Sequence, residues 1–469
     1  MLPLLTLLAF ALSAALPAAQ APRTRATSET ALDRYVAAPD AAYAWKVVTD
    51  LPAEGVTATL IEMTSQKWLT EKEVERPLWT HWMTVVRPAQ VTNDVGFLFI
   101  TGGSLSRPQP TGPPAWMVDM ARDTGTVITE LRLVPNQPIV FLDDPARKPR
   151  TEDDYIAYTW DKYLRTGDEK WPARLPMTKS AVRAMDTVTA FAASPQGGAT
   201  KVNRFVVAGA SKRGWTAWTT AVVDKRVVAV VPLVIDMLNV EPSFIHHWRA
   251  YGAWSNAVND YVEHGIMNWM GTPQFRALMK IEEPYEYRDR LTLPKFMVNA
   301  AGDQFFLPDS SQFYFDELRG EKHVRYVPNA GHSLDKTDAI ASVHAFYSSI
   351  VRNTPRPEVK WTLERDGSIK VVSKERPDAV VLWQATNPKA RNFRHDVVGA
   401  AYTSTPLEPS GPNTWVARVD KPEAGWRAFF VELTFPTGGK YPLKVTSGIR
   451  IVPETMPFPP PERKGPPTR

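Results

Sequence analysis

Residues 204–215 read RFVVAGASKRGW, and this stretch decides the fold. Its apolar run ends at Gly209, which is typical of a buried strand, and from Trp215 onward apolar residues recur at helical spacing. Ser211 therefore lies at a forced turn from strand to helix. Such a turn is a nucleophile elbow, which projects a serine oxygen above an α/β sheet.

The chemistry explains why a serine would be placed there. A serine hydroxyl is a weak nucleophile at neutral pH, so it must be exposed, held rigidly and given an adjacent base. The first helical N–H groups, beginning with that of Lys212, would face an oxyanion formed beside Ser211. The motif departs from the usual G-x-S-x-G, because its second glycine is displaced to Gly214 and Arg213 stands in the expected place.

An apolar strand is predicted at residues 294–300 and the next strand at residues 323–327, and both end in polar loops. Asp303 follows the first strand and His332 follows the second. Ser, Asp, His is the chain order of α/β-hydrolases, and the ends of parallel strands meet at one edge of the sheet. We therefore predict a catalytic triad of Ser211, Asp303 and His332, with Asp236 as the alternative acid.

An earlier apolar run, residues 96–100, is followed by Gly102-Gly103-Ser104. In α/β-hydrolases the loop after the third strand supplies a second oxyanion N–H, and glycine lets the backbone approach the substrate. We predict that Gly103, Ser104 and Lys212 bind the oxyanion or the substrate.

The composition sets the class of protein. The 469 residues suffice for two domains, and 43% apolar with 22% charged residues is typical of a soluble globular protein. Lys and Arg number 55 against 50 Asp and Glu, and these charges are dispersed, so nucleic-acid binding is not expected. Cysteine is absent, which excludes disulfides and is common in bacterial exported proteins.

Residues 1–21 carry an apolar run without charges, followed by small residues, and this pattern predicts a signal peptide. We expect a periplasmic or secreted protein, with no stable membrane insertion after removal of the signal and with a small ester or peptide as its partner. The sequence does not indicate the oligomeric state.

The chain divides into a larger and a smaller part. Alternating strands and helices over residues 22–353 predict a mostly parallel, α/β-hydrolase-like sheet covered on both sides, with Thr178 capping one of its helices. The aromatic-rich residues 239–290 interrupt this alternation and are predicted to form a helical cap. Residues 358–452 contain short strands and no helical period, which predicts a β-sandwich-like domain, and residues 453–469 form a Pro-rich tail.

A metal site is not predicted. Histidines and a glutamate do occur together in the cap, but H-E-x-x-H spacing is absent from them. They are His246, His247, Glu263 and His264. We expect no cofactor.

Four segments carry a resemblance to a known family: residues 175–179, 184–186, 209–215 and 299–306. They resemble the PhoPQ-activated pathogenicity-related proteins over nearly the whole mature chain. The resemblance implies an exported, α/β-hydrolase-like bacterial protein linked to virulence regulation and to resistance against antimicrobial peptides. A related eukaryotic branch resembles a secreted repressor of cell proliferation.

The displaced glycine also resembles the elbow of glucuronoyl esterases, where a basic residue after the serine assists the oxyanion. Lys212 occupies that place here. Its alternative role is a solvent-facing or ion-paired side chain on the helix that follows the elbow.

Together these patterns predict an exported serine hydrolase that acts on a carboxylic ester or a peptide bond. The alternative is a binding or signalling protein on the same scaffold, since fold alone does not give function. A third hypothesis is carbohydrate binding by residues 358–452.

Overall fold

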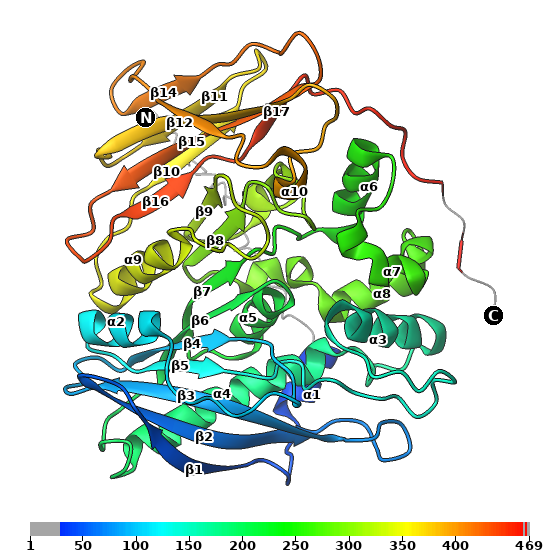
Figure 1. The fold of residues 1–469 in the computed structure, drawn as a ribbon, viewed down its shortest axis with the longest axis vertical. Coiled ribbons are helices and arrows are strands. Elements are labelled where there is room, and N and C mark those ends of the chain that lie inside the picture. The colour runs from blue at the N-terminus through cyan, green and yellow to red at the C-terminus, as the bar shows by residue number, and fades with distance from the viewer. Residues whose placement is uncertain (1–28, 463–464, 467–469) are drawn as a thin grey trace, which may run out of the picture.

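The computed structural model describes residues 29–462 and 465–466. The predicted signal peptide lies outside the described residues. The centre of the molecule is a nine-stranded sheet with the order β1-β2-β3-β5-β4-β6-β7-β8-β9 (Figure 1). Its strands are β1 (Ala44–Leu51), β2 (Val56–Lys67), β3 (Leu78–Pro88), β4 (Val95–Ile100), β5 (Ile128–Leu131), β6 (Arg204–Ala210), β7 (Val227–Leu233), β8 (Lys295–Ala300) and β9 (Lys322–Val327).

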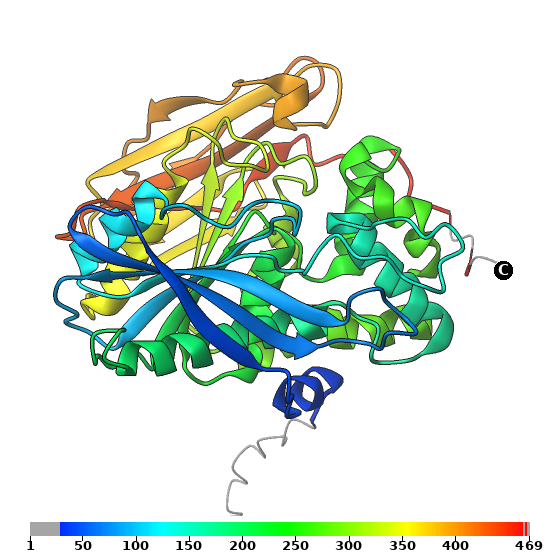
Figure 2. The ribbon, with the colours of Figure 1, turned by 60° about the horizontal axis from the view of Figure 1, so that its bottom comes forward.

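The sheet is parallel from β5 to β9, as the alternation of strands and helices predicts. β1, β2 and β3 pair antiparallel with their neighbours and form one edge. These strands twist strongly as they cross the molecule (Figure 2). β1 was not predicted, because an edge strand rich in exposed polar residues carries no clear apolar pattern.

Helices cover both faces of the sheet. α1 (Ala31–Ala37), α4 (Arg174–Ala193) and α5 (Lys212–Val223) pack on one face, and α2 (Ala115–Thr124) and α9 (Ala339–Val351) pack on the other. In β6 the side chain of Val207 belongs to the first core and that of Val206 to the second. This double coverage explains the unbroken apolar run of β6.

The start of α4 differs from the prediction. Thr178 does not cap a helix; it lies inside α4, where its hydroxyl donates to the carbonyl of Arg174 at 2.8 Å. Pro176 lies in the first turn of α4, where the missing N–H removes no helical hydrogen bond.

The segment between β7 and β8 is helical. It comprises α6 (Val240–Tyr251), η1 (Asn256–Val258), α7 (Asn259–Glu263), η2 (Ile266–Trp269), α8 (Pro273–Glu282) and η3 (Pro284–Arg290). These elements lie beside α3 (Glu152–Thr166), at the right of the ribbon in Figure 1. Among the described residues, the helices include none that is long and apolar enough to cross a membrane.

Separate antiparallel sheets form the C-terminal part, drawn from yellow to red in Figure 1. One contains β10 (Val359–Leu363), β11 (Ile369–Ser373) and β14 (Thr414–Ala417). The other contains β12 (Ala379–Asn387), β13 (Thr403–Pro406), β15 (Trp426–Phe435), β16 (Leu443–Thr446) and β17 (Arg450–Val452). The hydroxyl of Thr446 in β16 accepts the N–H of Tyr326 in β9 at 3.0 Å, which joins this part to the central sheet.

Candidate active site

Ser211 stands at the turn between β6 and α5 in a strained conformation. Its φ is 57° and its ψ is −129°, a region that side-chain-bearing residues rarely occupy. Both glycines of the motif allow close packing around this turn. A Cβ on Gly209 would lie 2.5 Å from the carbonyl oxygen of Arg213, and one on Gly214 would lie 2.6 Å from Ile235 Cγ2. The displaced glycine is therefore required by the contact of α5 with Ile235.

Asp303 and His332 lie together at the carboxyl ends of β8 and β9. His332 Nδ1 is 2.8 Å from Asp303 Oδ2 and 3.1 Å from Oδ1. Asp303 Oδ1 also accepts the N–H of Phe305 at 2.8 Å, and the ring of Phe305 packs on that of His332. The carboxylate thus fixes one nitrogen of the imidazole and leaves Nε2 for proton transfer.

Asp236, the alternative acid, is engaged elsewhere. It is buried and accepts hydrogen bonds from the hydroxyls of Tyr314 and Tyr326, the latter at 2.7 Å. Burial raises its pKa to about 7. The carboxylate paired with His332 is that of Asp303.

Ser211 and His332 border one cavity of about 670 Å³, together with Gly102, Lys212 and Phe305. Within the described part of the chain, the hydrogen bonds include none between Ser211 Oγ and His332 Nε2. Such bonds are often long before a substrate closes the site.

The loop after β4 reaches this cavity through Thr101 and Gly102. Gly103 follows, and its carbonyl accepts a hydrogen bond from Gln137 Nε2 at 2.8 Å. The hydroxyl of Ser104 is bonded to that of Ser106 at 2.7 Å. A contribution of Gly103 and Ser104 to an oxyanion site stays a prediction.

An ion-pair network lies beside the elbow. An ion pair was one alternative for Lys212, but sequence reasoning identified neither its acidic partners nor the pair of Arg213 with Glu152. Arg213 donates from both terminal nitrogens to the two oxygens of Glu152, at 2.7 Å each. Lys212 Nζ lies 2.8 Å from Glu152 Oε2 and 3.3 Å from Asp153 Oδ2. The Lys212 side chain is thus ion-paired while it borders the cavity, and its main-chain N–H lies at the start of α5.

The network balances charge beside Ser211. Burial would raise the pKa of Glu152, but hydrogen bonds and charge from Arg213 and Lys212 outweigh it and hold that pKa well below its usual range. The acidic start of α3 was the available signal. It did not identify a partner, because a run of acids at a helix N-terminus is also explained by the helix dipole.

The cap histidines have protein partners. His246 Nε2 lies 3.0 Å from Asp309, and His264 Nε2 lies 2.9 Å from Asp154. In the described segments, no group of three or more His, Asp or Glu side chains is arranged to hold a metal ion.

The C-terminal part contacts both loops that carry the acid and the base. The N–H of His395 donates to the carbonyl of Gly302 at 2.8 Å. Asn329 and Tyr402 exchange two hydrogen bonds, at 2.8 and 2.9 Å. Residues of the C-terminal part therefore support the two loops that carry Asp303 and His332.

A mostly parallel sheet with a serine elbow, followed in order by an acid and a histidine at later strand ends, defines an α/β-hydrolase fold. This chain belongs to the PhoPQ-activated pathogenicity-related protein family, whose sequence model matches residues 32–394. The family resemblance of the sequence is thereby confirmed.

The chain is also similar to a curated relative and to solved structures. Autocrine proliferation repressor protein A of Dictyostelium discoideum is 38% identical over 458 residues, which cover 92% of each chain. Acetyl xylan esterase 1 from Thermoanaerobacterium sp. has a TM-score of 0.47 at 13% identity, covering 68% of this chain and 91% of its own. Glucuronoyl esterase from Solibacter usitatus has a TM-score of 0.39 at 14% identity, covering 69% and 90%.

Proposed function

We propose that this protein is an exported serine hydrolase that cleaves a carboxylic ester. The observation that carries the proposal is the pairing of Asp303 with His332 on the border of the cavity that also exposes Ser211. A strained serine at the start of a helix, on the same cavity as a carboxylate-bound imidazole, supports activation of a hydroxyl nucleophile.

In the proposed reaction, Ser211 Oγ attacks the ester carbonyl carbon while His332 Nε2 takes its proton. The N–H of Lys212 and the loop after β4 stabilise the oxyanion. The alcohol then leaves with the proton from His332, which forms an acyl-enzyme on Ser211. Water attacks this acyl-enzyme while His332 takes its proton, and the proton returns to Ser211 Oγ as the carboxylic acid leaves. Asp303 holds the imidazole tautomer and stabilises the imidazolium.

A peptide bond is the second candidate. Lys212 and Arg213 would repel a cationic peptide, yet both are paired with Glu152. The carboxylates of Glu152 and Asp153 together balance the charges of Lys212 and Arg213. This balance supports cleavage of cationic antimicrobial peptides, and a periplasmic or secreted location would suit it. Ester and amide substrates with the same acyl group would separate the two candidates.

The test is labelling with a fluorophosphonate probe. We expect labelling of the wild-type protein and none of Ser211→Ala. Ser333→Ala is the matched control, because Ser333 borders the same cavity and should leave labelling unchanged. Labelling that persists in Ser211→Ala would contradict the assignment.

A binding or signalling role is the alternative, and the name of the Dictyostelium relative favours it. Under this alternative the folded wild-type protein would not react with the probe and would hydrolyse neither esters nor amides.

A further inference from the structure

Ser211 also borders a second, much smaller cavity. This recess has a volume of about 50 Å³ and lies on the side of the elbow that faces α3 and the helical segment between β7 and β8. Its lining includes Trp160, Trp215, Met237, Phe244, Val258 and Phe305.

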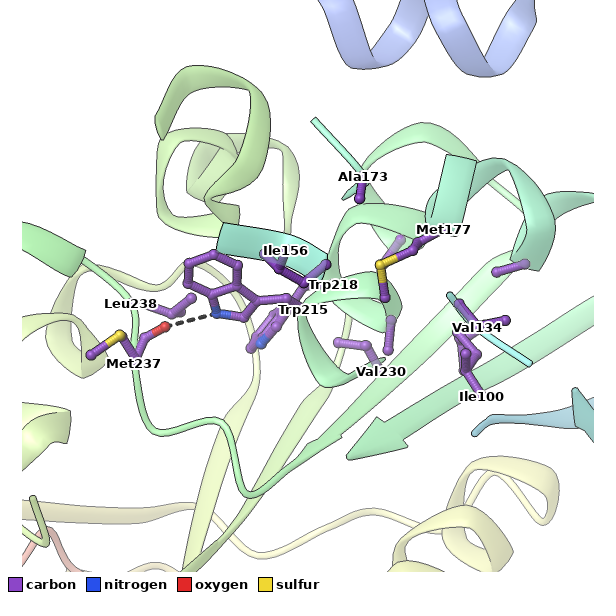
Figure 3. Packing of buried hydrophobic residues seen from close by; sticks show 14 of the residues in the cluster. Ile100, Val134, Ile156, Ala173, Met177, Trp215, Trp218, Val230, Met237 and Leu238 are labelled. Carbon is purple, nitrogen blue, oxygen red and sulfur yellow. Dashed lines mark hydrogen bonds between the residues drawn. The ribbon is translucent and has the colours of Figure 1, made fainter. Parts of the chain in front are cut away.

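The walls of the recess are mostly apolar. Most of the polar groups among its lining residues are hydrogen-bonded within the protein, whereas Trp160 Nε1 is buried without a hydrogen-bond partner among the described residues. Trp215 Nε1 donates to the carbonyl of Met237 at 2.8 Å, as Figure 3 shows. The hydroxyl of Tyr261 donates to Asp153 Oδ1 at 3.1 Å. Arg174 donates to Thr216 Oγ1 at 2.7 Å and also to the carbonyl of Lys212. The recess therefore suits a hydrocarbon group.

The walls of the recess are tightly packed, so widening it is unfavourable. Trp160, Trp215, Phe244 and Val258 come from α3, α5, α6 and η1, and each is no more than 4% exposed. Side chains held between several packed elements resist displacement, so extra methylene groups cannot be forced between them without strain.

The larger cavity shares Asp153, Ser211, Lys212 and Phe305 with the recess but differs from it in its other lining residues. It is about 670 Å³ and includes polar and charged side chains such as Glu152, Ser333 and Lys336. A bulky, polar group would fit there. The two cavities that Ser211 borders thus differ in volume and in their share of polar side chains.

We infer that the substrate is an ester of a short fatty acid, acetyl or propionyl, whose hydrocarbon part enters the recess while a larger polar alcohol occupies the 670 Å³ cavity. This inference rests on the proposed function. An apolar cavity of about 150 Å³ holds benzene, so one of about 50 Å³ holds about two carbon atoms.

The experiment measures kcat/KM for two series of esters. In the first, p-nitrophenol is esterified with acetyl, butyryl, hexanoyl and octanoyl groups. In the second, acetyl is joined to alcohols from methanol to a monosaccharide. We expect acetyl to exceed hexanoyl by at least about 10-fold, since a single methylene changes discrimination by about 10- to 200-fold. Size of the alcohol should matter little.

Two variants that enlarge the recess test whether it sets the preference for short acyl groups. Val258→Ala and Phe244→Leu remove carbon atoms from the walls and should raise the hexanoyl-to-acetyl ratio by about 10-fold. Val240→Ala is the matched control, because Val240 is 1% exposed in the same helical segment and does not border the recess. Its ratio should equal that of the wild type.

The outcomes separate the two proposals. Hydrolysis of long acyl esters as fast as acetyl esters, or a ratio that neither enlarging variant changes, would overturn the short-acyl assignment and leave the hydrolase intact. Strong dependence on the alcohol with none on the acyl group would also overturn it. Absence of Ser211-dependent labelling and of all turnover, in protein folded by circular dichroism, would overturn both.

Discussion

The guanidinium of Arg391, in the C-terminal β domain, donates to Asp309 Oδ2 at 2.6 Å. Asp309 lies on the segment that follows Asp303, and it is also bonded to His246 of α6. Burial would raise the pKa of Asp309, but the charges of Arg391 and His246 hold that pKa well below its usual range. Three parts of the chain therefore meet at one buried carboxylate.

Arg391→Met should destabilise the protein strongly, because it leaves Asp309 buried with a histidine as its remaining partner. We expect the free energy of unfolding, measured in urea, to fall by about 3–5 kcal/mol. Arg418→Met is the matched control, since the pair of Arg418 with Asp366 in the same domain is exposed and should change stability little. Equal effects of the two substitutions would contradict the role given to Arg391.

Asp303→Asn should lower kcat by about 10⁴-fold, because an amide cannot hold the imidazole in the required tautomer or stabilise the imidazolium. Asp236→Asn is the comparison, since that side chain is bonded to two tyrosines rather than to His332. Ester turnover by both variants would be measured at one pH. A larger loss in Asp236→Asn would reverse the assignment of the acid.

Gly102→Ala should reduce activity through Arg213. An added Cβ would lie 2.3 Å from one terminal nitrogen of Arg213 and 2.7 Å from its Cζ, so the guanidinium must move away from Glu152. Small displacements near a reacting centre can cost about 100-fold, and we expect kcat/KM to fall by about 10- to 100-fold. Gly112→Ala, whose Cβ would meet its nearest atom at 3.8 Å, should have no effect.

Asp236 should make stability depend on pH. Its pKa is 3.8 in the unfolded chain and about 7 in the fold, so the folded protein binds more protons between these values. Its contribution to stability is complete below pH 4 and is lost as the pH rises towards 7. Burial lowers the pKa of His81 to about 4, which acts in the opposite direction over part of this range.

The measurement must therefore compare two proteins. Urea unfolding of the wild type and of Asp236→Asn between pH 4.5 and 8 isolates the carboxyl group, and the variant should lose less stability as the pH rises. Parallel curves for the two proteins would show that Asp236 does not titrate in this range.

The fold and the predicted triad follow from local patterns. β6 and β8 are buried on both faces, so each appears in the sequence as a largely apolar run with a polar loop after it. β9 is buried as well, although it contains Lys322, His323 and Arg325, and a polar loop also follows it. Parallel strands bring such loops to one edge, which is why Ser211, Asp303 and His332 could be predicted as neighbours without coordinates.

The network around the elbow could not be predicted in this way. Glu152 and Lys212 are 60 positions apart, and Asp309 and Arg391 are 82 positions apart. In a sequence, each of these charges is equally compatible with a solvated surface. The recess beside Ser211 depends on how aromatic side chains from several elements pack, and no local pattern encodes its volume.

The hydrogen bonds from His395 to Gly302 and between Asn329 and Tyr402 have a practical consequence. A chain shortened to residues 29–353 would keep every strand of the central sheet but would lose the hydrogen-bond partners of the loops that carry Asp303 and His332. The C-terminal sheets are therefore part of the support of the site, and the protein should be expressed and engineered with both parts present.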